Sequence, residues 1–122
     1  MAIQFGGRSE KNMEYNFSYV YTPMAENDYD AAISYISEEL CNPDAASALD
    51  ESIYEAVQNL CHSPFSGTIV ENPFLSCNGV RYVPVKRYLL YYFPDMVHER
   101  IVVMRISHSL QDQDKIVSEI RV

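Results

Sequence analysis

A strand and a helix are the first regular elements that the hydrophobic pattern predicts. Between residues 15 and 21 aromatic side chains occupy every second position, as in a half-buried strand: Tyr15, Phe17, Tyr19 and Tyr21. Thr22 and Pro23 are typical of a helix start, because threonine caps free N–H groups and proline has none. Apolar residues then recur at helical spacing up to Leu40, in a stripe that we expect to be buried. The pattern predicts a helix that ends near Cys41.

A second helix follows directly. Asn42 and Pro43 repeat the start signal, and another apolar stripe continues to Leu60 or Cys61. The turn between the two helices is so short that they must form an antiparallel hairpin. Cys41 and Cys61 each end a helix of this hairpin, so they lie roughly 25 Å apart, beyond the reach of a disulfide bond. We expect both to be reduced thiols that are buried or half-buried.

The rest of the chain is predicted to hold a loop and three strands. Residues 62–79 are rich in turn formers and leave room for one short strand. Strand patterns cover residues 80–87, 88–93 and 100–106. Pro84 places the first of these at an edge or bulge, and Pro94 with Asp95 is the expected turn between the other two. Short connections predict an antiparallel meander. The apolar residues at 116–120 fit either a last helical turn or a strand.

These elements predict an α+β fold in the order β-α-α-β-β-β, with an antiparallel sheet packed on an antiparallel helix hairpin. The chain has 122 residues, of which 48% are hydrophobic, so it suits one domain that we place over residues 14–122. Residues 1–13 show no periodicity and are expected to be a flexible N-terminal extension. We expect a single core, formed by Ile33, Ile36, Leu40, Leu49, Ile53 and Leu60 against Tyr19, Val83, Leu90 and Val103.

Charge is distributed unevenly along the chain. Its 9 Lys and Arg stand against 17 Asp and Glu, a net charge of -8, and residues 12–80 contain no Lys or Arg at all. From Arg81 onward cations exceed acids, so a partner that recognises phosphates would approach only this part. No apolar run is long enough for a membrane span, and the N-terminus lacks a secretory signal, so we expect a cytoplasmic protein.

Common enzyme signatures do not occur in this sequence. His98 and Glu99 could begin the zinc-binding H-E-x-x-H motif, but Val102 stands where the second histidine is needed. There is no G-x-S-x-G, no phosphate-binding loop and no G-x-G-x-x-G. Adjacent acidic pairs on the helices diverge in direction and are expected to be solvated. We therefore predict no metal site and no cofactor.

Six segments carry a family resemblance through their order and spacing. They are residues 21–25 (YTPMA), 42–46 (NPDAA), 59–64 (NLCHSP), 80–85 (VRYVPV), 87–92 (RYLLYY) and 105–112 (RISHSLQD). Together they resemble the RelE/ParE toxin superfamily over about residues 15–114. The resemblance implies the toxin of a type II toxin–antitoxin pair, with a cognate antitoxin as its partner. RelE-like members are ribosome-dependent messenger RNA endonucleases, and ParE-like members poison DNA gyrase.

The resemblance also assigns candidate site residues. Arg81, Arg105 and His108 are the candidate catalytic residues, and Lys86, Arg87 and Tyr88 are the candidate substrate-binding residues. We expect Arg81, Arg105 and His108 to lie together on an open face of the sheet, away from the helices. Each candidate also has a structural interpretation: Arg81 would pair with a helix carboxylate, Lys86 and Arg87 would be solvated turn residues, and Tyr88 would pack in the sheet.

Three departures from the RelE-like pattern bear on the activity. Leu89 follows Tyr88 where an arginine is expected, Tyr82 and Pro84 stand in place of a lysine pair, and no tyrosine follows His108. The sequence therefore favours a ParE-like inhibitor of gyrase. A metal-independent messenger RNA endonuclease acting on the ribosome is the first alternative, and a noncatalytic domain that only binds an antitoxin is the second.

Overall fold

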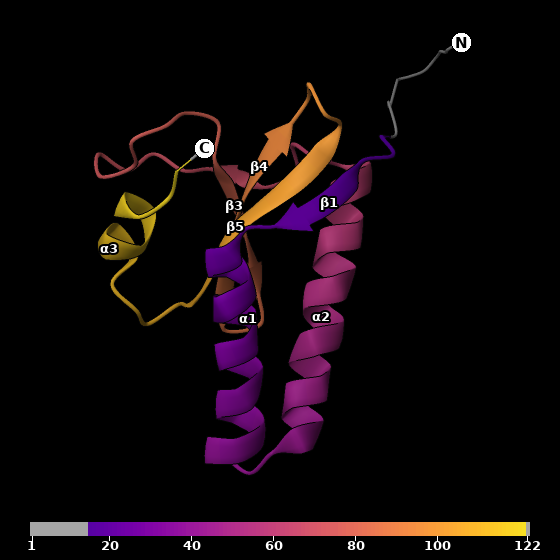
Figure 1. Cartoon of the computed structure of the whole chain (residues 1–122), viewed down its shortest axis with the longest axis vertical. Helices are drawn as coiled ribbons and strands as arrows, with labels where there is room; N and C mark the ends of the chain where they lie inside the picture. Colours follow the sequence, from indigo (N-terminus) through magenta and orange to yellow (C-terminus); the bar gives the residue numbers. More distant parts are fainter. Residues whose placement is uncertain (1–14, 122) are drawn as a thin grey trace.

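A five-stranded sheet with helices on both faces makes up residues 15–121, which are the residues that this computed structural model describes (Figure 1). The predicted extension over residues 1–13 lies outside them. In chain order the elements are β1 (Ser18–Tyr21), α1 (Pro23–Ser34), the π-helical turn η1 (Tyr35–Glu39), α2 (Pro43–His62), β2 (Thr68–Ile69), β3 (Arg81–Val85), β4 (Tyr88–Asp95), β5 (Arg100–His108) and α3 (Gln113–Ser118). The α+β class and the helix hairpin are confirmed, and the undecided C-terminal segment is a helix.

Both predicted helix starts are confirmed by their caps. The side chain of Thr22 accepts a hydrogen bond from the backbone N–H of Ala25 at 3.1 Å, and Asn42 does the same for Ala45 at 3.1 Å. In Figure 1 α1 and α2 lie side by side, and their joined ends extend beyond the sheet. Within the described residues no helix is long and apolar enough to cross a membrane.

The end of the first helix differs from the prediction. Its last turn is the wider π-type, in which the Leu40 N–H bonds the Tyr35 carbonyl at 3.0 Å, and this turn moves Leu40 off the buried stripe. Leu40 is 55% exposed. Cys41 then takes the left-handed conformation, with φ of 50°, and is exposed rather than buried. Cys61, at the other end of the hairpin, is buried as expected.

The sheet order is β1-β5-β4-β3-β2. β3, β4 and β5 form the predicted antiparallel meander, but β1 pairs with β5 in parallel, from Ser18 opposite Arg100 to Tyr21 opposite Val103. β2 pairs with β3 only at two positions, so Pro84 lies past its end at an open edge, as predicted.

The predicted turn at Pro94 and Asp95 is wrong, because both residues belong to β4. The Asp95 carboxylate accepts hydrogen bonds from the backbone N–H groups of Val97 and His98 at 3.1 and 3.2 Å. These side-chain hydrogen bonds stabilise a turn at residues 96–99, which follows Asp95 and does not include it.

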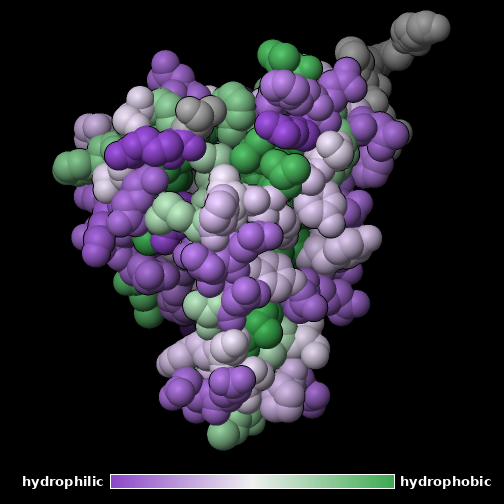
Figure 2. Space-filling model, in the orientation of Figure 1, coloured by the Kyte–Doolittle hydropathy of each residue, from purple (hydrophilic) through white to green (hydrophobic). Residues whose placement is uncertain are grey.

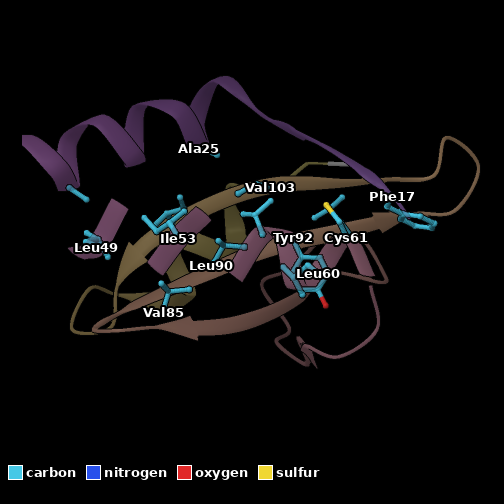
Figure 3. Packing of buried hydrophobic residues seen from close by; sticks show 14 residues of the cluster. Phe17, Ala25, Leu49, Ile53, Leu60, Cys61, Val85, Leu90, Tyr92 and Val103 are labelled. Atoms are coloured by element: carbon cyan, nitrogen blue, oxygen red, sulfur yellow. The ribbon is translucent and has the colours of Figure 1, made fainter. Parts of the chain in front are cut away.

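The hydrophobic residues form two clusters rather than the expected single core. The larger one packs the buried stripe of α2 against strand residues such as Leu90, Tyr92 and Val103 (Figure 3). The second cluster places Tyr91 and Met104 against Ile116, Val117 and Ile120, in and just after α3. Because Tyr91 and Leu90 are neighbours in one strand, the two clusters lie on opposite faces of the sheet. Tyr19, which was predicted to be in the core, is 42% exposed.

Replacing Leu49 by alanine is expected to lower the free energy of unfolding by about 2 to 5 kcal/mol, because a fully packed side chain leaves a cavity. Leu49 is 2% exposed. The matched control is Leu40→Ala, the same change at a position that is 55% exposed, for which we expect less than about 0.5 kcal/mol. Urea unfolding followed by circular dichroism measures both. Equal losses in the two variants would show that the burial pattern of the helix pair is wrong.

Candidate functional site

Arg81 fastens the loop that follows α2. Its Nη1 atom donates hydrogen bonds to the carbonyl oxygens of Phe65 at 3.0 Å and Gly67 at 2.8 Å, and its guanidinium lies 5.2 Å from the centre of the Phe65 ring. The neighbouring Tyr92 hydroxyl donates to the Pro64 carbonyl and accepts from the Gly67 N–H. Burial raises the pKa of Tyr92. Arg81 therefore binds backbone carbonyls, not the helix carboxylate that one interpretation of the sequence expected.

Arg105 is held by two carboxylates. Its Nε atom lies 2.7 Å from one oxygen of Asp28 and its Nη2 atom 3.2 Å from the other, while Nη1 lies 2.8 Å from Glu119. The Asp28 carboxylate also accepts the backbone N–H of Ile106 at 2.9 Å, so it binds the edge of β5 where β1 no longer covers it. These hydrogen bonds, that of Asp28 first, raise the pKa of Arg105. The Arg105 side chain is 9% exposed and joins α1, β5 and the segment after α3.

The three candidate catalytic residues do not lie together. Arg81 stands opposite Tyr92 and His108 opposite Tyr88, so they share a face but are separated by four residues of β4, roughly 13 Å. Arg105 stands opposite Tyr91 and so belongs to the other face. The predicted grouping on one open face is wrong. A bulge in β5, opposite Tyr91 and Tyr92, was not expected from the sequence, and it shifts the alternation of the β5 side chains before Arg105.

The structure does bring four of the six candidates to one end of the sheet. Lys86 and Arg87 form the turn between β3 and β4, Tyr88 opens β4, and His108 ends β5 directly opposite Tyr88. The rings of Tyr88 and His108 meet edge to face with their centres 5.2 Å apart. The Ser109 N–H donates to the Arg87 carbonyl at 2.8 Å and ties the turn to the segment after β5.

A hollow of about 560 Å³ lies beside the Tyr88 and His108 rings. Its lining combines α1 and η1 with the strand ends and the following loop: Asp28, Ala31, Ala32, Tyr35, Tyr88, Ile106, His108, Leu110 and Gln111. Sequence reasoning did not single out Tyr35 or Leu110, which are 53% and 87% exposed. Tyr35 lies outside the apolar stripe of the helix, and this position could have identified it from the sequence.

A backbone N–H group lies against the His108 ring. Its Nδ1 atom lies 3.1 Å from the backbone N–H of Leu110, which can only donate, so Nδ1 accepts and the neutral ring carries its proton on Nε2. Gln111 holds the same loop by accepting the His108 N–H at 2.8 Å. In this arrangement the lone pair of the neutral ring accepts the Leu110 N–H. The ring can donate a hydrogen bond into the hollow but cannot take up a proton without losing the bond to Leu110.

Comparison with known proteins identifies the family. A sequence model described as the ParE toxin of the type II toxin–antitoxin system parDE matches residues 19–113, which is most of the chain. The chain belongs to the ParE toxin family. The resemblance to the RelE/ParE superfamily is thereby confirmed, and the protein is a toxin of a type II toxin–antitoxin system. The matched residues run from β1 to the start of α3 and include all six candidate residues of this toxin.

Two solved structures have a similar fold to the toxin. One is a chain of the chromosomal ParDE system of P. aeruginosa, with a TM-score of 0.59 and 22% identity, covering 76% of this chain and 96% of that chain. The other belongs to the RelBE2 toxin–antitoxin complex of Mycobacterium tuberculosis, with a TM-score of 0.53 and 18% identity, covering 76% of the toxin and 98% of that chain. No curated protein sequence matches the toxin significantly.

Proposed function

We propose that this toxin arrests growth by inhibiting DNA gyrase through protein contact, and that it does not cleave messenger RNA on the ribosome. The observation that carries the proposal is the pairing of its strand arginines. Arg81 is bound to backbone carbonyls, and Arg105 is bound to Asp28 and Glu119. Arg105 is neutralised by its carboxylates, and neither arginine is part of the lining of the hollow beside His108.

RNA cleavage at the 2′-hydroxyl has two chemical requirements that this hollow meets poorly. Cations must stabilise the charge that develops on the phosphorus oxygens, and a base must remove the hydroxyl proton. His108 Nδ1 already accepts the Leu110 N–H. Around the hollow, the cations without an ionic partner among residues 15–121 are Lys86 and Arg87, which lie in the exposed turn and not in the lining.

Net charge supports the same conclusion. The toxin carries -8, and α1 and α2 contain no Lys or Arg. An acidic protein is repelled by the polyanionic ribosome, and only cations at the site of contact can offset this repulsion. A protein target with an acidic patch would instead attract the turn of Lys86 and Arg87. We assign the contact with gyrase to this turn together with Tyr88.

We further propose that a cognate antitoxin neutralises the toxin. The support is that both similar solved structures come from toxin–antitoxin systems. Co-expression of the protein encoded next to the toxin gene is expected to restore growth. Wild-type toxin that never slows growth when expressed alone would instead favour the noncatalytic domain that only binds an antitoxin.

The endonuclease alternative rests on one specific observation, which is that His108, Tyr88, Lys86 and Arg87 meet at one end of the sheet. A catalytic role for Arg81, Arg105 and His108 therefore stays a prediction of that alternative. The endonuclease alternative requires that His108 acts on RNA directly.

Replacing His108 by alanine is expected to leave growth arrest within about threefold of wild type, because inhibition of gyrase by protein contact needs no general base. An endonuclease that used this ring would lose roughly 100-fold or more. Growth on titrated expression, and primer extension on messenger RNA from translating ribosomes, measure the two cases. His98→Ala, at the exposed turn between β4 and β5, is the matched control. Cleavage at defined codon positions by wild type, lost in His108→Ala alone, would replace our proposal with the endonuclease.

A further inference from the structure

A second hollow, which we call the tyrosine groove, lies between β1, α1 and α2. It measures about 650 Å³ and is lined by Tyr19, Tyr21, Tyr29, Ser47, Asp50, Glu51, Tyr54 and Val57. It shares no lining residue with the hollow beside His108. Its lining combines four tyrosines with two carboxylates and the buried Val57.

The aromatic rings of the tyrosine groove are arranged edge to face. The ring centres of Tyr19 and Tyr21 are 6.0 Å apart at 75°, and those of Tyr21 and Tyr29 are 5.9 Å apart at 73°. Perpendicular neighbours present ring faces in more than one direction, and all three rings belong to the lining of the groove. Tyr54 is 59% exposed, although it is one of the large apolar side chains of the chain. Burial, with smaller contributions from Tyr19 and Asp50, raises the pKa of Tyr21 to about 12, so its hydroxyl stays neutral.

The charges around the tyrosine groove are all negative. Asp50 and Glu51 belong to its lining, and Glu26 and Asp30 line a smaller hollow that shares Tyr21 and Tyr29 with it. None of these four carboxylates forms an ion pair with another residue in the range 15–121. In the view of Figure 2 the region of the helix pair has mostly hydrophilic to intermediate colours, with small and separate hydrophobic areas. A purely apolar occupant would therefore leave these carboxylates without partners.

We propose that the tyrosine groove receives the cationic side chains of a basic segment of the antitoxin. The proposal rests on the antitoxin partnership proposed above and names the chemistry of that contact. Guanidinium and ammonium groups are attracted to the faces of aromatic rings and bind carboxylates through charged hydrogen bonds, and this groove offers both to one ligand. The stretch from residue 12 to 80 has no cation of its own to occupy it. The occupant must supply the positive charge.

The experiment is an NMR titration of the whole toxin with N-acetyl-arginine methylamide. The citrulline analogue, which has nearly the same shape without the charge, is the matched probe. We expect saturable shifts of the Tyr21, Asp50 and Tyr54 amides with the arginine probe, and affinity at least about fivefold weaker with citrulline. The test variant Asp50→Asn with Glu51→Gln should also lose about fivefold. Glu38→Gln with Glu39→Gln changes the net charge equally at the exposed end of the helix pair and should bind as wild type.

The outcomes separate this proposal from its rivals. Equal losses in the two double variants, or equal binding of citrulline, would overturn it in favour of general charge attraction or apolar filling. Tighter probe binding in a variant with Arg8→Gln and Lys11→Gln would assign the groove to residues of this chain itself. Shifts that grow with toxin concentration in the absence of probe would assign it to a second copy. Either result overturns the antitoxin assignment. The titration does not depend on growth arrest, so its failure leaves the gyrase proposal standing, and the reverse also holds.

A second measurement ties the tyrosine groove to the antitoxin. The protein encoded beside the toxin gene should bind the Asp50→Asn, Glu51→Gln variant at least about tenfold more weakly than the Glu38→Gln, Glu39→Gln control, because a charged contact is removed at each position. Unchanged affinity in both, despite a positive titration, would show that the groove serves a different cationic partner.

Discussion

Replacing Asp28 by alanine is expected to lower the free energy of unfolding by about 2 to 4 kcal/mol, less than for a fully buried ion pair, because Asp28 is 17% exposed and Arg105 keeps Glu119. The carboxylate of Asp28 accepts three hydrogen bonds, from Nε and Nη2 of Arg105 and from the backbone N–H of Ile106. Its loss leaves a guanidinium that is 9% exposed with Glu119 as its remaining partner. It also leaves an N–H at the edge of β5 without an acceptor. Urea unfolding measures the change.

Two controls make this prediction specific. Asp30→Ala changes the same residue type two positions later on α1, where the side chain is exposed, and should cost less than about 0.5 kcal/mol. Arg105→Met added to Asp28→Ala should recover part of the loss, because it removes a buried charge that keeps only the 40% exposed Glu119 as its partner. If the double variant is as unstable as the sum of the two single variants, the ion pair does not account for the effect.

Reversing the charges of the turn with Lys86→Glu and Arg87→Glu is expected to reduce growth arrest by at least about 100-fold while leaving the unfolding midpoint nearly unchanged. Both side chains are exposed and neither has an ionic partner within residues 15–121. Their proposed role is to attract an acidic protein surface, and like charges placed against each other in an interface cost several kcal/mol. Growth under titrated expression, with toxin levels measured by immunoblot, gives the comparison.

The matched control for the turn is Lys115→Glu with Arg121→Glu, which changes the net charge equally in and after α3. Both residues are exposed. This control should retain growth arrest, because α3 is not part of the proposed contact. Equal loss in the two double variants would attribute the effect to net charge and remove the turn from the proposed target surface.

Local sequence signals predicted the parts of the fold that depend on neighbouring residues. The caps at Thr22 and Asn42 act on N–H groups three positions away, and both helices begin where these residues predicted. The antiparallel pairing of β4 with β5 was predicted in the same way, but the register that places His108 opposite Tyr88 was not. The exposure of Leu40 was not predicted either, because the π-type turn before it depends on how the two helices join.

Contacts between distant residues could not be predicted from one sequence. The parallel pairing of β1 with β5 and the ion pair of Arg105 with Asp28 both join segments about 80 residues apart. Nothing in the apolar sequence of β5 indicates the bulge, yet the bulge decides which face of the sheet Arg105 occupies. For this reason the family could be identified from the sequence, but the pairing of Arg105 with Asp28 and Glu119 could not.

The central claim is that the toxin acts on gyrase through a protein contact. The most direct measurement is the supercoiling of relaxed plasmid DNA by purified gyrase in the presence of increasing amounts of the purified toxin. We expect supercoiling to be inhibited by wild type and by His108→Ala at similar concentrations, and to be restored with the Lys86→Glu, Arg87→Glu variant. Full supercoiling at a large molar excess of folded wild-type toxin would contradict the account.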